Sequence, residues 1–426
     1  MAGSPPAVPD ACGIDFGTSN STAGCALAGT PGQVALLALE EGKLTLPSVV
    51  FFHAGDAHIS YGRAALADYL AGDEGRLMRS MKSLLGTALI NEQTEVAGRA
   101  LPFRALLAQF IGELKRRAEH AAGRGFTRAV LGRPVFFVDA DAAADRQAQD
   151  TLSEIARAVG FTDIAFQYEP IAAAFDYEMQ ITREELVLVV DIGGGTSDFA
   201  LVRLAPERVG MADRRDDILA SGGVHIGGTD FDKSLSLASV MPLLGLGSLL
   251  RSGLQMPSAL YFSLATWHTI NFAYTKKAWA QIGELLLEAQ ERDKLARLQR
   301  LVSERAGHWL AMQVEEAKIS LSGAPQAVLD LGRIDPGETR VLQRADFDAA
   351  IGGLVGSVER SITELLRDAG VAADAVDTVF FTGGASSVPL LRAQVASLLP
   401  RARRVEGDLF GSIGTGLALD ALRKFA

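Results

Sequence analysis

The stretch VLVVDIGGGTSDFALV, residues 187–202, decides how the rest of the sequence is interpreted. Its first half is apolar and rich in β-branched residues, which is typical of a buried strand. Three glycines then allow a tight reversal, and apolar residues resume after Asp198. Asp191 stands at the end of the first strand, where burying a carboxylate without a partner is unfavourable. The stretch therefore predicts a β-hairpin whose turn lies beside a charged ligand.

A related stretch lies near the N-terminus. CGIDFGTSNSTAG, residues 12–24, again runs from apolar residues through an aspartate, Asp15, to glycine and threonine. Because the order of residue types is the same in both places, a duplicated half-domain is the simplest account. Each copy is predicted to be a strand, a tight turn and a second strand.

The residues of these turns favour a phosphate ligand. Glycines let the backbone approach a bulky anion, and consecutive N–H groups form a partly positive nest. Hydroxyl donors are added by Thr18, Ser19 and Thr196. An aspartate would repel a phosphate unless a cation lay between them, so Asp15 and Asp191 imply a hydrated Mg²⁺. One glycine-rich turn is more often only a turn, but two matching copies that face each other would grip a triphosphate from both sides.

Composition limits the class of protein. A chain of 426 residues with 48% hydrophobic content can form a large core or two domains. The net charge of −10 argues against a general nucleic-acid binder. Two cysteines, Cys12 and Cys25, are too few for a disulfide framework, so we expect a reducing, cytoplasmic compartment. We expect both to be buried thiols that face each other across a hairpin.

Targeting and membrane signals are weak. The first ten residues lack the basic and apolar segments of a secretory signal and are predicted to be a flexible tail. Residues 234–250 and 252–275 carry no formal charge, yet they contain Pro, Ser, Gly, His268 and Asn271. This composition favours a buried or interfacial helical region, with membrane contact as the alternative.

Four further motifs follow the two turns along the chain: YEPIAAAFDYE (168–178), GGTDFD (227–232), VEEAKISLS (314–322) and FTGGASSVPLL (381–391). Together with the paired turns, they resemble the seventy-kilodalton heat-shock (DnaK-type) chaperone family, whose paired loops are shared with actin and hexokinase. The resemblance covers nearly the whole chain and implies an α/β, duplicated actin-like (ribonuclease H-like) ATPase fold with two lobes around a nucleotide cleft.

The same resemblance implies catalytic and metal-binding roles. Lys82, in RSMKSLLG, matches the lysine that positions the attacking water, and Glu169 matches the glutamate that orients metal-bound water. The implied catalytic set is Lys82, Glu169, Asp191 and Thr196, and the implied set for Mg²⁺, with K⁺ nearby, is Asp15, Asp191 and Asp198.

ATP or ADP is the implied nucleotide. The spacing of Glu315, Lys318 and Ser322 puts a carboxylate, an ammonium and a hydroxyl on one helix face, where they match the family's adenosine contacts. Alone, the first two would be read as an ordinary solvated ion pair. The other expected nucleotide-binding residues are Gly17, Thr18, Ser19, Asn20, Gly193, Gly194, Gly195, Gly227, Gly228, Gly383, Gly384 and Asp408.

Two departures from the family pattern affect the expected function. Ile319 and Ser387 stand where the chaperones have two arginines that sandwich adenine. Stacked cations contribute roughly 0.5 to 2 kcal/mol each, so we expect weaker nucleotide binding and less preference for adenine. The given sequence also ends with GSIGTGLALDALRKFA, residues 411–426, so no peptide-binding domain is expected. With its extra residues between Asp230 and Glu315, the chain resembles the short, YegD-type bacterial homologues.

Periodicity completes the expected architecture. Residues 146–160 and 346–369 repeat apolar positions on one helix face and alternate with β-rich runs, as in a mixed α/β sheet. Residues 285–312 are predicted to form one long helix, with a face that is either solvated or a partner surface. The expected domains are a tail at 1–10, lobe I at 11–186, lobe II at 187–409 with an enlarged outer subdomain at 233–345, and a final helix at 410–426 that packs on lobe I.

These observations favour a slow Mg²⁺-dependent ATPase of the chaperone family. Its lobes would close on nucleotide, and its output would go to a partner or client protein, without nucleic acid or membrane. One alternative is a nucleotide-sensing scaffold that does not hydrolyse, and Lys82→Ala would distinguish the two. Another alternative is an actin-like filament former, which would pellet with ATP in a concentration-dependent way.

Overall fold

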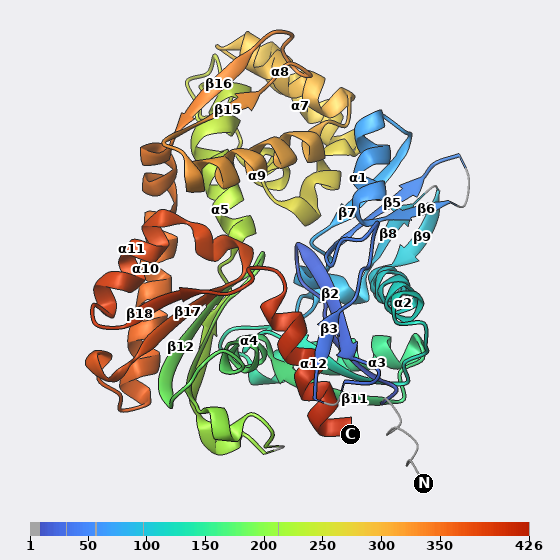
Figure 1. Ribbon diagram of the computed structural model, residues 1–426. Helices are drawn as coiled ribbons and strands as arrows, with labels where there is room; N and C mark the ends of the chain where they lie inside the picture. Colours follow the sequence, from blue (N-terminus) through green and yellow to red (C-terminus); the bar gives the residue numbers. More distant parts are fainter. Residues whose placement is uncertain (1–8, 31, 56–57, 97, 212, 426) are drawn as a thin grey trace. The chain divides into compact units, whose positions relative to one another are not determined.

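The computed structural model describes residues 9–30, 32–55, 58–96, 98–211 and 213–425 (Figure 1). Helices and strands alternate along them, and the predicted mixed α/β class is confirmed. Most of the predicted tail, residues 1–8, lies outside the described residues. The chain divides into two compact units: the first comprises residues 1–227, 357–386 and 391–426, and the second comprises 228–356 and 387–390.

Two large sheets in the first unit share one strand order. The first runs β11–β10–β1–β2–β3 and the second runs β14–β13–β12–β17–β18. In each, the leading hairpin strand pairs antiparallel with the next strand and parallel with a strand from later in the chain. Both predicted hairpins are confirmed. The strands are β1 (Ala11–Asp15), β2 (Asn20–Ala26), β3 (Val34–Leu36), β10 (Arg128–Arg133) and β11 (Asp163–Tyr168), then β12 (Glu185–Ile192), β13 (Ser197–Leu204), β14 (Ile218–Val224), β17 (Thr378–Thr382) and β18 (Arg403–Glu406).

The two cysteines confirm the register of the first hairpin. Cys12 in β1 lies opposite Cys25 in β2, and both are buried free thiols. In the second hairpin, seven of the eight residues of β12 are buried. Such a continuous buried run is typical of a strand covered on both faces.

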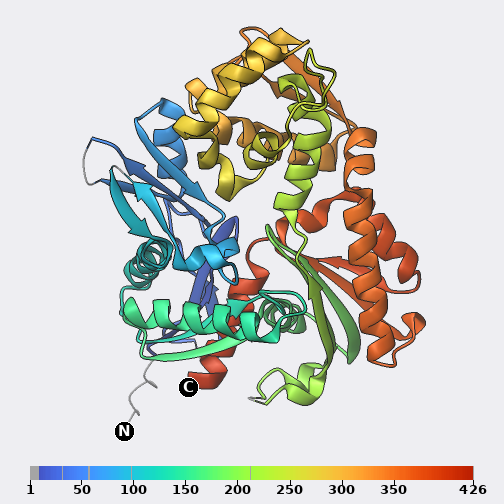
Figure 2. The ribbon, with the colours of Figure 1, turned by 180° about the vertical axis from the view of Figure 1, so that it is seen from behind.

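Helices α4 (Glu169–Glu178) and α12 (Ser412–Phe425) form a layer between the two sheets. Helix α12 contacts β1, β2 and β10, whereas α4 contacts β12 and β13. A β carbon at Gly416 would lie 1.7 Å from the carbonyl oxygen of Ala172, so only glycine permits this crossing of α12 over α4. Helices α2 (Phe103–Ala122) and α3 (Ala142–Ala158) lie on the other side of the first sheet (Figure 2).

Local signals explain two of these helices. The Asp141 side chain accepts hydrogen bonds from the backbone N–H groups of Ala143 and Ala144, which caps α3. This helix confirms the one predicted at 146–160. Pro170 occupies the first turn of α4, where its missing N–H removes no helical hydrogen bond.

A smaller region of the first unit follows the first hairpin. Strands β6, β5 and β7 form a three-stranded sheet against which α1 packs, and β8 and β9 form a separate hairpin. Its elements are β4 (Leu46–Pro47), β5 (Val49–His53), β6 (Ile59–Tyr61), α1 (Gly62–Ala71), β7 (Gly75–Arg79), η1 (Met81–Leu84), η2 (Ala88–Asn91), β8 (Gln93–Val96) and β9 (Arg99–Pro102).

The second unit is mainly helical. Its elements are α5 (Gly228–Leu235), η5 (Ser236–Val240), η6 (Met241–Leu244), α6 (Ala259–Leu264), η7 (Trp267–Tyr274), α7 (Lys276–Glu288), α8 (Arg292–Ser303), α9 (Gly307–Gly323), and the hairpin β15 (Gln326–Asp330) and β16 (Thr339–Gln343). Helix α10 (Arg344–Asp368), which confirms the helix predicted at 346–369, begins in this unit, and α11 (Pro389–Leu398) follows later. Within the described ranges, every helix is too short or too polar to span a bilayer.

The single helix predicted for 285–312 is wrong. Ala289 leaves the end of α7 in an extended conformation and forms a bridge with Leu250. Arg305 then ends α8 with a left-handed φ of 50°, while the N–H of Ala306 donates to the carbonyl of Leu301. This arrangement is a Schellman-type helix end without its usual glycine. The end of α8 could therefore not be predicted from the residue type.

Candidate functional site

The turns of the two hairpins lie against each other within the first unit. The N–H of Gly193 donates to the carbonyl of Thr196 over 3.0 Å and closes the β12–β13 turn. A β carbon at Gly194 would lie 2.4 Å from Ser19 Oγ, and one at Gly195 would lie 2.9 Å from Thr18 Oγ1. The structure therefore brings the predicted turn residues together, and glycine at these positions makes the approach possible.

Four buried carboxylates gather beside these turns. Asp15 ends β1, Asp191 lies near the end of β12 opposite Asp198 of β13, and Glu169 begins α4. Oxygen atoms of Glu169, Asp191 and Asp198 lie within 4.8 Å of one another. Among the described residues, Asp15 Oδ1, Asp191 Oδ1 and Asp198 Oδ2 find no hydrogen-bond partner. Unsatisfied buried carboxylate oxygens are unfavourable unless a cation joins them.

The pKa values of these acids also indicate that their negative charges are poorly compensated within the protein. Burial, followed by repulsion from Glu169, raises the pKa of Asp15 from 3.8 to about 7. Burial and Glu169 likewise raise the pKa of Asp198 from 3.8 to about 7. For Asp191, burial and then its three acidic neighbours raise the pKa well above the ordinary value. The candidate metal ligands are all carboxylate oxygens, and the protein does not fully balance their negative charge. They therefore fit a hard divalent cation such as Mg²⁺.

Lys82 partly offsets this negative charge. It lies in η1 next to Ser80, whose backbone is left-handed with φ 57°. Its Nζ is 2.5 Å from Glu169 Oε1, and both side chains are buried. Burial alone would lower the pKa of Lys82, but attraction to Glu169 and Asp15 outweighs it and raises the pKa. The ammonium is therefore charged at neutral pH and can act as a hydrogen-bond donor.

A small cavity opens beside the cluster. Several residues that line this cavity were not predicted from the sequence. One of them is His225, and the only sequence feature that could have indicated it is its position two residues before Gly227. The backbone N–H of Val135, next to the cavity residue Pro134, donates to Asp198 Oδ1 over 2.6 Å. The lining residues are Thr18, Lys82, Ser83, Leu85, Pro134, Phe137, Gly195, Thr196 and His225.

Other predicted residues surround the turns. Gly227 lies close to the β12–β13 turn, since a β carbon at position 227 would be 2.6 Å from the backbone nitrogen of Gly195. Gly383, with φ +77°, would place a β carbon 2.5 Å from Asp191 Oδ1. Gly384 packs against the ring of Phe410.

Two further predicted residues make local contacts. Gly17 forms the tight turn of the first hairpin, because a β carbon there would be 2.0 Å from the carbonyl oxygen of Asn20. Asp408 is exposed before α12 and accepts a hydrogen bond from the N–H of Phe410 over 3.1 Å. These contacts give Gly17 and Asp408 clear roles in shaping their loops.

The predicted adenosine residues lie on α9 in the second unit. Lys318 Nζ is 2.8 Å from Asp232 Oδ1 and donates to the carbonyl of Gly228 over 3.2 Å. The Ser322 hydroxyl donates to the carbonyl of Lys318, and Glu315 is half-buried. Asp232 was not predicted as a partner of Lys318, because the two are far apart in the sequence.

Comparison with known proteins places the chain in a family. The sequence model described as Hsp70 protein matches residues 11–238 and 283–419. "Chaperone protein HscA" of Serratia proteamaculans (strain 568) is 27% identical over 438 residues, which cover 97% of this chain and 58% of that protein. "Chaperone protein HscA homolog" of Bordetella petrii is 28% identical over 429 residues, covering 96% of this chain and 57% of the relative.

The chain thus spans less than two thirds of the length of these curated relatives. The family match nevertheless runs from the first hairpin to the last helix and includes both glycine turns and the four carboxylates. This protein belongs to the Hsp70 family.

Proposed function

We propose that this protein binds Mg²⁺–ATP and hydrolyses it slowly, and that the resulting closure of its lobes is passed to a protein partner. The observation that carries the proposal is the group of buried carboxylates with unsatisfied oxygens beside the paired glycine turns. Members of the Hsp70 family bind ATP or ADP with Mg²⁺ and bind client proteins, which supports the same conclusion.

The metal would be held by Asp15, Asp191 and Asp198, directly or through water. When bound, Mg²⁺ supplies positive charge that stabilises both the carboxylates and the phosphate oxygens. The turn N–H groups of Gly194 and Gly195 would donate to phosphate oxygens, as would the nearby hydroxyls. In the same proposal, the rest of the phosphate cradle is Gly17, Thr18, Ser19, Asn20, Gly193, Thr196, Gly227, Gly383 and Gly384, with K⁺ beside Asp198 and Thr196.

Lys82 would position the attacking water, and Glu169 would orient metal-bound water. The protonated ammonium of Lys82 can donate a hydrogen bond to the attacking water, and the carboxylate of Glu169 can accept one from metal-bound water. Because the Lys82 pKa is raised, its role is to position the water, not to remove a proton from it. In-line phosphoryl transfer depends mostly on such positioning and on positive charge.

Among the described residues, the nucleoside end of the proposed site lacks a cation that could stack on the base. Glu315, Lys318, Ser322 and Gly228 would contact the adenosine, with Asp408 closing the pocket, and Lys318 is already paired with Asp232. Ile319, which is 62% exposed, presents no cation for stacking on a base. We therefore infer weak, poorly selective nucleotide binding. We also propose that the protein is a YegD-type member of the family. The proposed lobes are 11–186 and 187–409, with an outer part at 233–345 and a final helix at 410–426.

The test is a nucleotide panel with Mg²⁺, followed by thermal melting and phosphate release. A ligand at 100 times its dissociation constant adds about 2.7 kcal/mol of stability, which melting can detect. Stabilisation together with Mg²⁺-dependent phosphate release is expected, and Lys82→Ala should remove the release while retaining the stabilisation. Stabilisation without release would identify the non-hydrolysing scaffold, and ATP-dependent pelleting would identify a filament former. No stabilisation by any nucleotide would overturn the proposal.

A further inference from the structure

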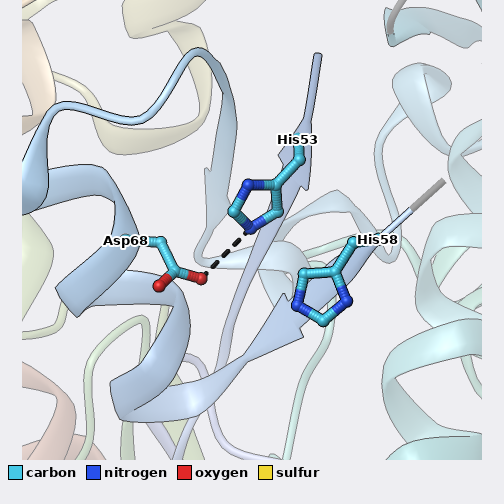
Figure 3. Close-up of side chains that lie close together, drawn as sticks. All are labelled: His53, His58 and Asp68. Atoms are coloured by element: carbon cyan, nitrogen blue, oxygen red, sulfur yellow. Dashed lines mark hydrogen bonds and ion pairs between the residues drawn. The ribbon is translucent and has the colours of Figure 1, made fainter. Parts of the chain in front are cut away.

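A second group of metal-ligating side chains lies away from the carboxylate cluster, on the small sheet of the first unit. His53 ends β5, His58 directly precedes β6, and Asp68 lies on α1 (Figure 3). One ligating atom from each of these three residues lies within 4.8 Å of the other two. None of them belongs to the nucleotide site proposed above.

The distances within this group suit a transition-metal ion. His53 Nε2 is 3.1 Å from Asp68 Oδ2. Two ligands of one tetrahedral Zn²⁺ lie about 3.3 Å apart, because Zn–N and Zn–O distances are about 2.0–2.1 Å. The rings of His53 and His58 have centroids 4.9 Å apart, and Figure 3 shows them side by side below the strand end. His58 is exposed, and its Nε2 is 3.4 Å from the Ser60 hydroxyl oxygen.

Neighbouring side chains orient two of the proposed ligands, Asp68 and His53. The Ser60 hydroxyl donates to Asp68 and orients its carboxylate. Asp73 Oδ2 lies 3.8 Å from His53 Nδ1, on the side of the ring opposite the group. A carboxylate on this side of the ring attracts the positive charge that the imidazole gains when Nε2 binds a cation.

The Ser60 hydroxyl lies at the centre of the group. Its Oγ is 3.0 Å from His53 Nε2 and 3.4 Å from His58 Nε2, and it also bonds Asp68. It is buried, so a fourth oxygen lies beside the three ligand atoms. An ion held by these ligands would have two imidazoles and one carboxylate, with the hydroxyl or a water as fourth ligand.

We propose that His53, His58 and Asp68 form a binding site for Zn²⁺ or a related divalent transition ion. Two histidines and a carboxylate with one open position are a ligand set that Zn²⁺ uses, whereas Mg²⁺ prefers oxygen alone. The ion fastens the β5–β6 hairpin to α1. This site is independent of the proposed nucleotide function.

The test uses the full chain and Co²⁺ as a spectroscopic probe, with excess Mg²⁺ to saturate the oxygen-only site. We expect one equivalent of Co²⁺ to bind with the strong visible absorption of a four-coordinate ion, and Zn²⁺ to displace it. His58→Gln removes an exposed ligand and leaves the packing intact, so it should weaken binding at least tenfold. Asp68→Asn should do the same. The matched control is His120→Gln, at the exposed end of α2, which should leave the affinity unchanged.

Two further variants separate a metal site from a simple hydrogen-bond network. Asp73→Asn should weaken Zn²⁺ binding about 10–100-fold, as loss of an orienting carboxylate does elsewhere. Ser60→Ala retains all three ligands, so it should still bind one equivalent. Equal affinity in His58→Gln and His120→Gln, or less than one equivalent in the unmodified chain, would overturn the proposal. Melting curves of each variant without metal show whether it is folded.

Discussion

Lys82 Nζ lies 2.5 Å from Glu169 Oε1, and each side chain is less than one-tenth exposed. The pair joins the turn after β7 to the first residue of α4, two segments 87 positions apart in the sequence. Because both charges are buried, removing one leaves the other without compensation.

Lys82→Ala should therefore affect both stability and turnover. Breaking a buried ion pair destabilises by about 3–5 kcal/mol, which urea unfolding of the apoprotein would measure. Mg²⁺–ATP binding should persist while phosphate release is lost. Lys115→Ala is the matched control, since Lys115 Nζ is also 2.5 Å from a glutamate oxygen, that of Glu119, but the pair is less buried. Equal losses of stability in the two variants would contradict the argument.

Asp191→Asn should stabilise the apoprotein and abolish its response to Mg²⁺. The pKa of Asp191 is raised by burial and by three acidic neighbours, so a neutral amide relieves repulsion in the folded state. The expected result is a higher melting temperature without ligand and no further rise with Mg²⁺–ATP. Asp150→Asn, at an exposed position of α3, is the control and should change neither quantity. A lower melting temperature for Asp191→Asn would show that the charge is satisfied within the fold.

Glu185 gives a pH-dependent prediction. It accepts hydrogen bonds from Thr378 and Tyr177 and pairs with Arg403. Burial alone would raise its pKa, but these partners hold it below the ordinary 4.5. A lowered pKa stabilises the fold above the ordinary value, and this contribution is lost as the pH falls through the lower, folded-state pKa.

Glu185→Gln should therefore cost about 1.5–3 kcal/mol of unfolding free energy at neutral pH, the usual contribution of hydrogen bonds to a charged group. The difference from the unmodified protein should shrink as the pH falls below about 4. Urea unfolding at neutral and acidic pH measures both. Glu207→Gln, at an exposed position, should show almost no effect at either pH. A difference that is independent of pH would mean that the charge of Glu185 is not the cause.

Ile319→Arg should strengthen nucleotide binding. Position 319 is 62% exposed on α9, so a guanidinium can be placed there without repacking. A stacked cation contributes about 0.5–2 kcal/mol, or about two- to thirtyfold in affinity, which calorimetry with ATP and GTP would measure. Ser320→Arg adds the same charge at the next exposed position and should have little effect. Similar gains in both variants would point to net charge instead of stacking.

Local sequence patterns predicted what depends on local geometry. The two hairpins and the opposed Cys12 and Cys25 all follow from strand patterns and turn residues. The Lys82–Glu169 pair depends on how distant segments pack. No local sequence pattern predicted it, and only the family resemblance indicated these two residues.

Two other features were also invisible to pattern reasoning. The end of α8 uses a left-handed arginine, Arg305, where glycine is the usual signal. His53, His58 and Asp68 come from a strand, a loop and a helix, so their spacing follows no ligand motif. Both cases are set by tertiary contacts and not by residue type.

Where α12 crosses α4, main chain meets main chain at Gly416 and Ala172, with no side chain between them. A layer of side chains can absorb a small shift by changing rotamers, but two touching backbones cannot. The two helices are therefore expected to move together as one rigid body. A spin label on each, away from the crossing, should report a narrow and unchanging separation whatever the rest of the molecule does.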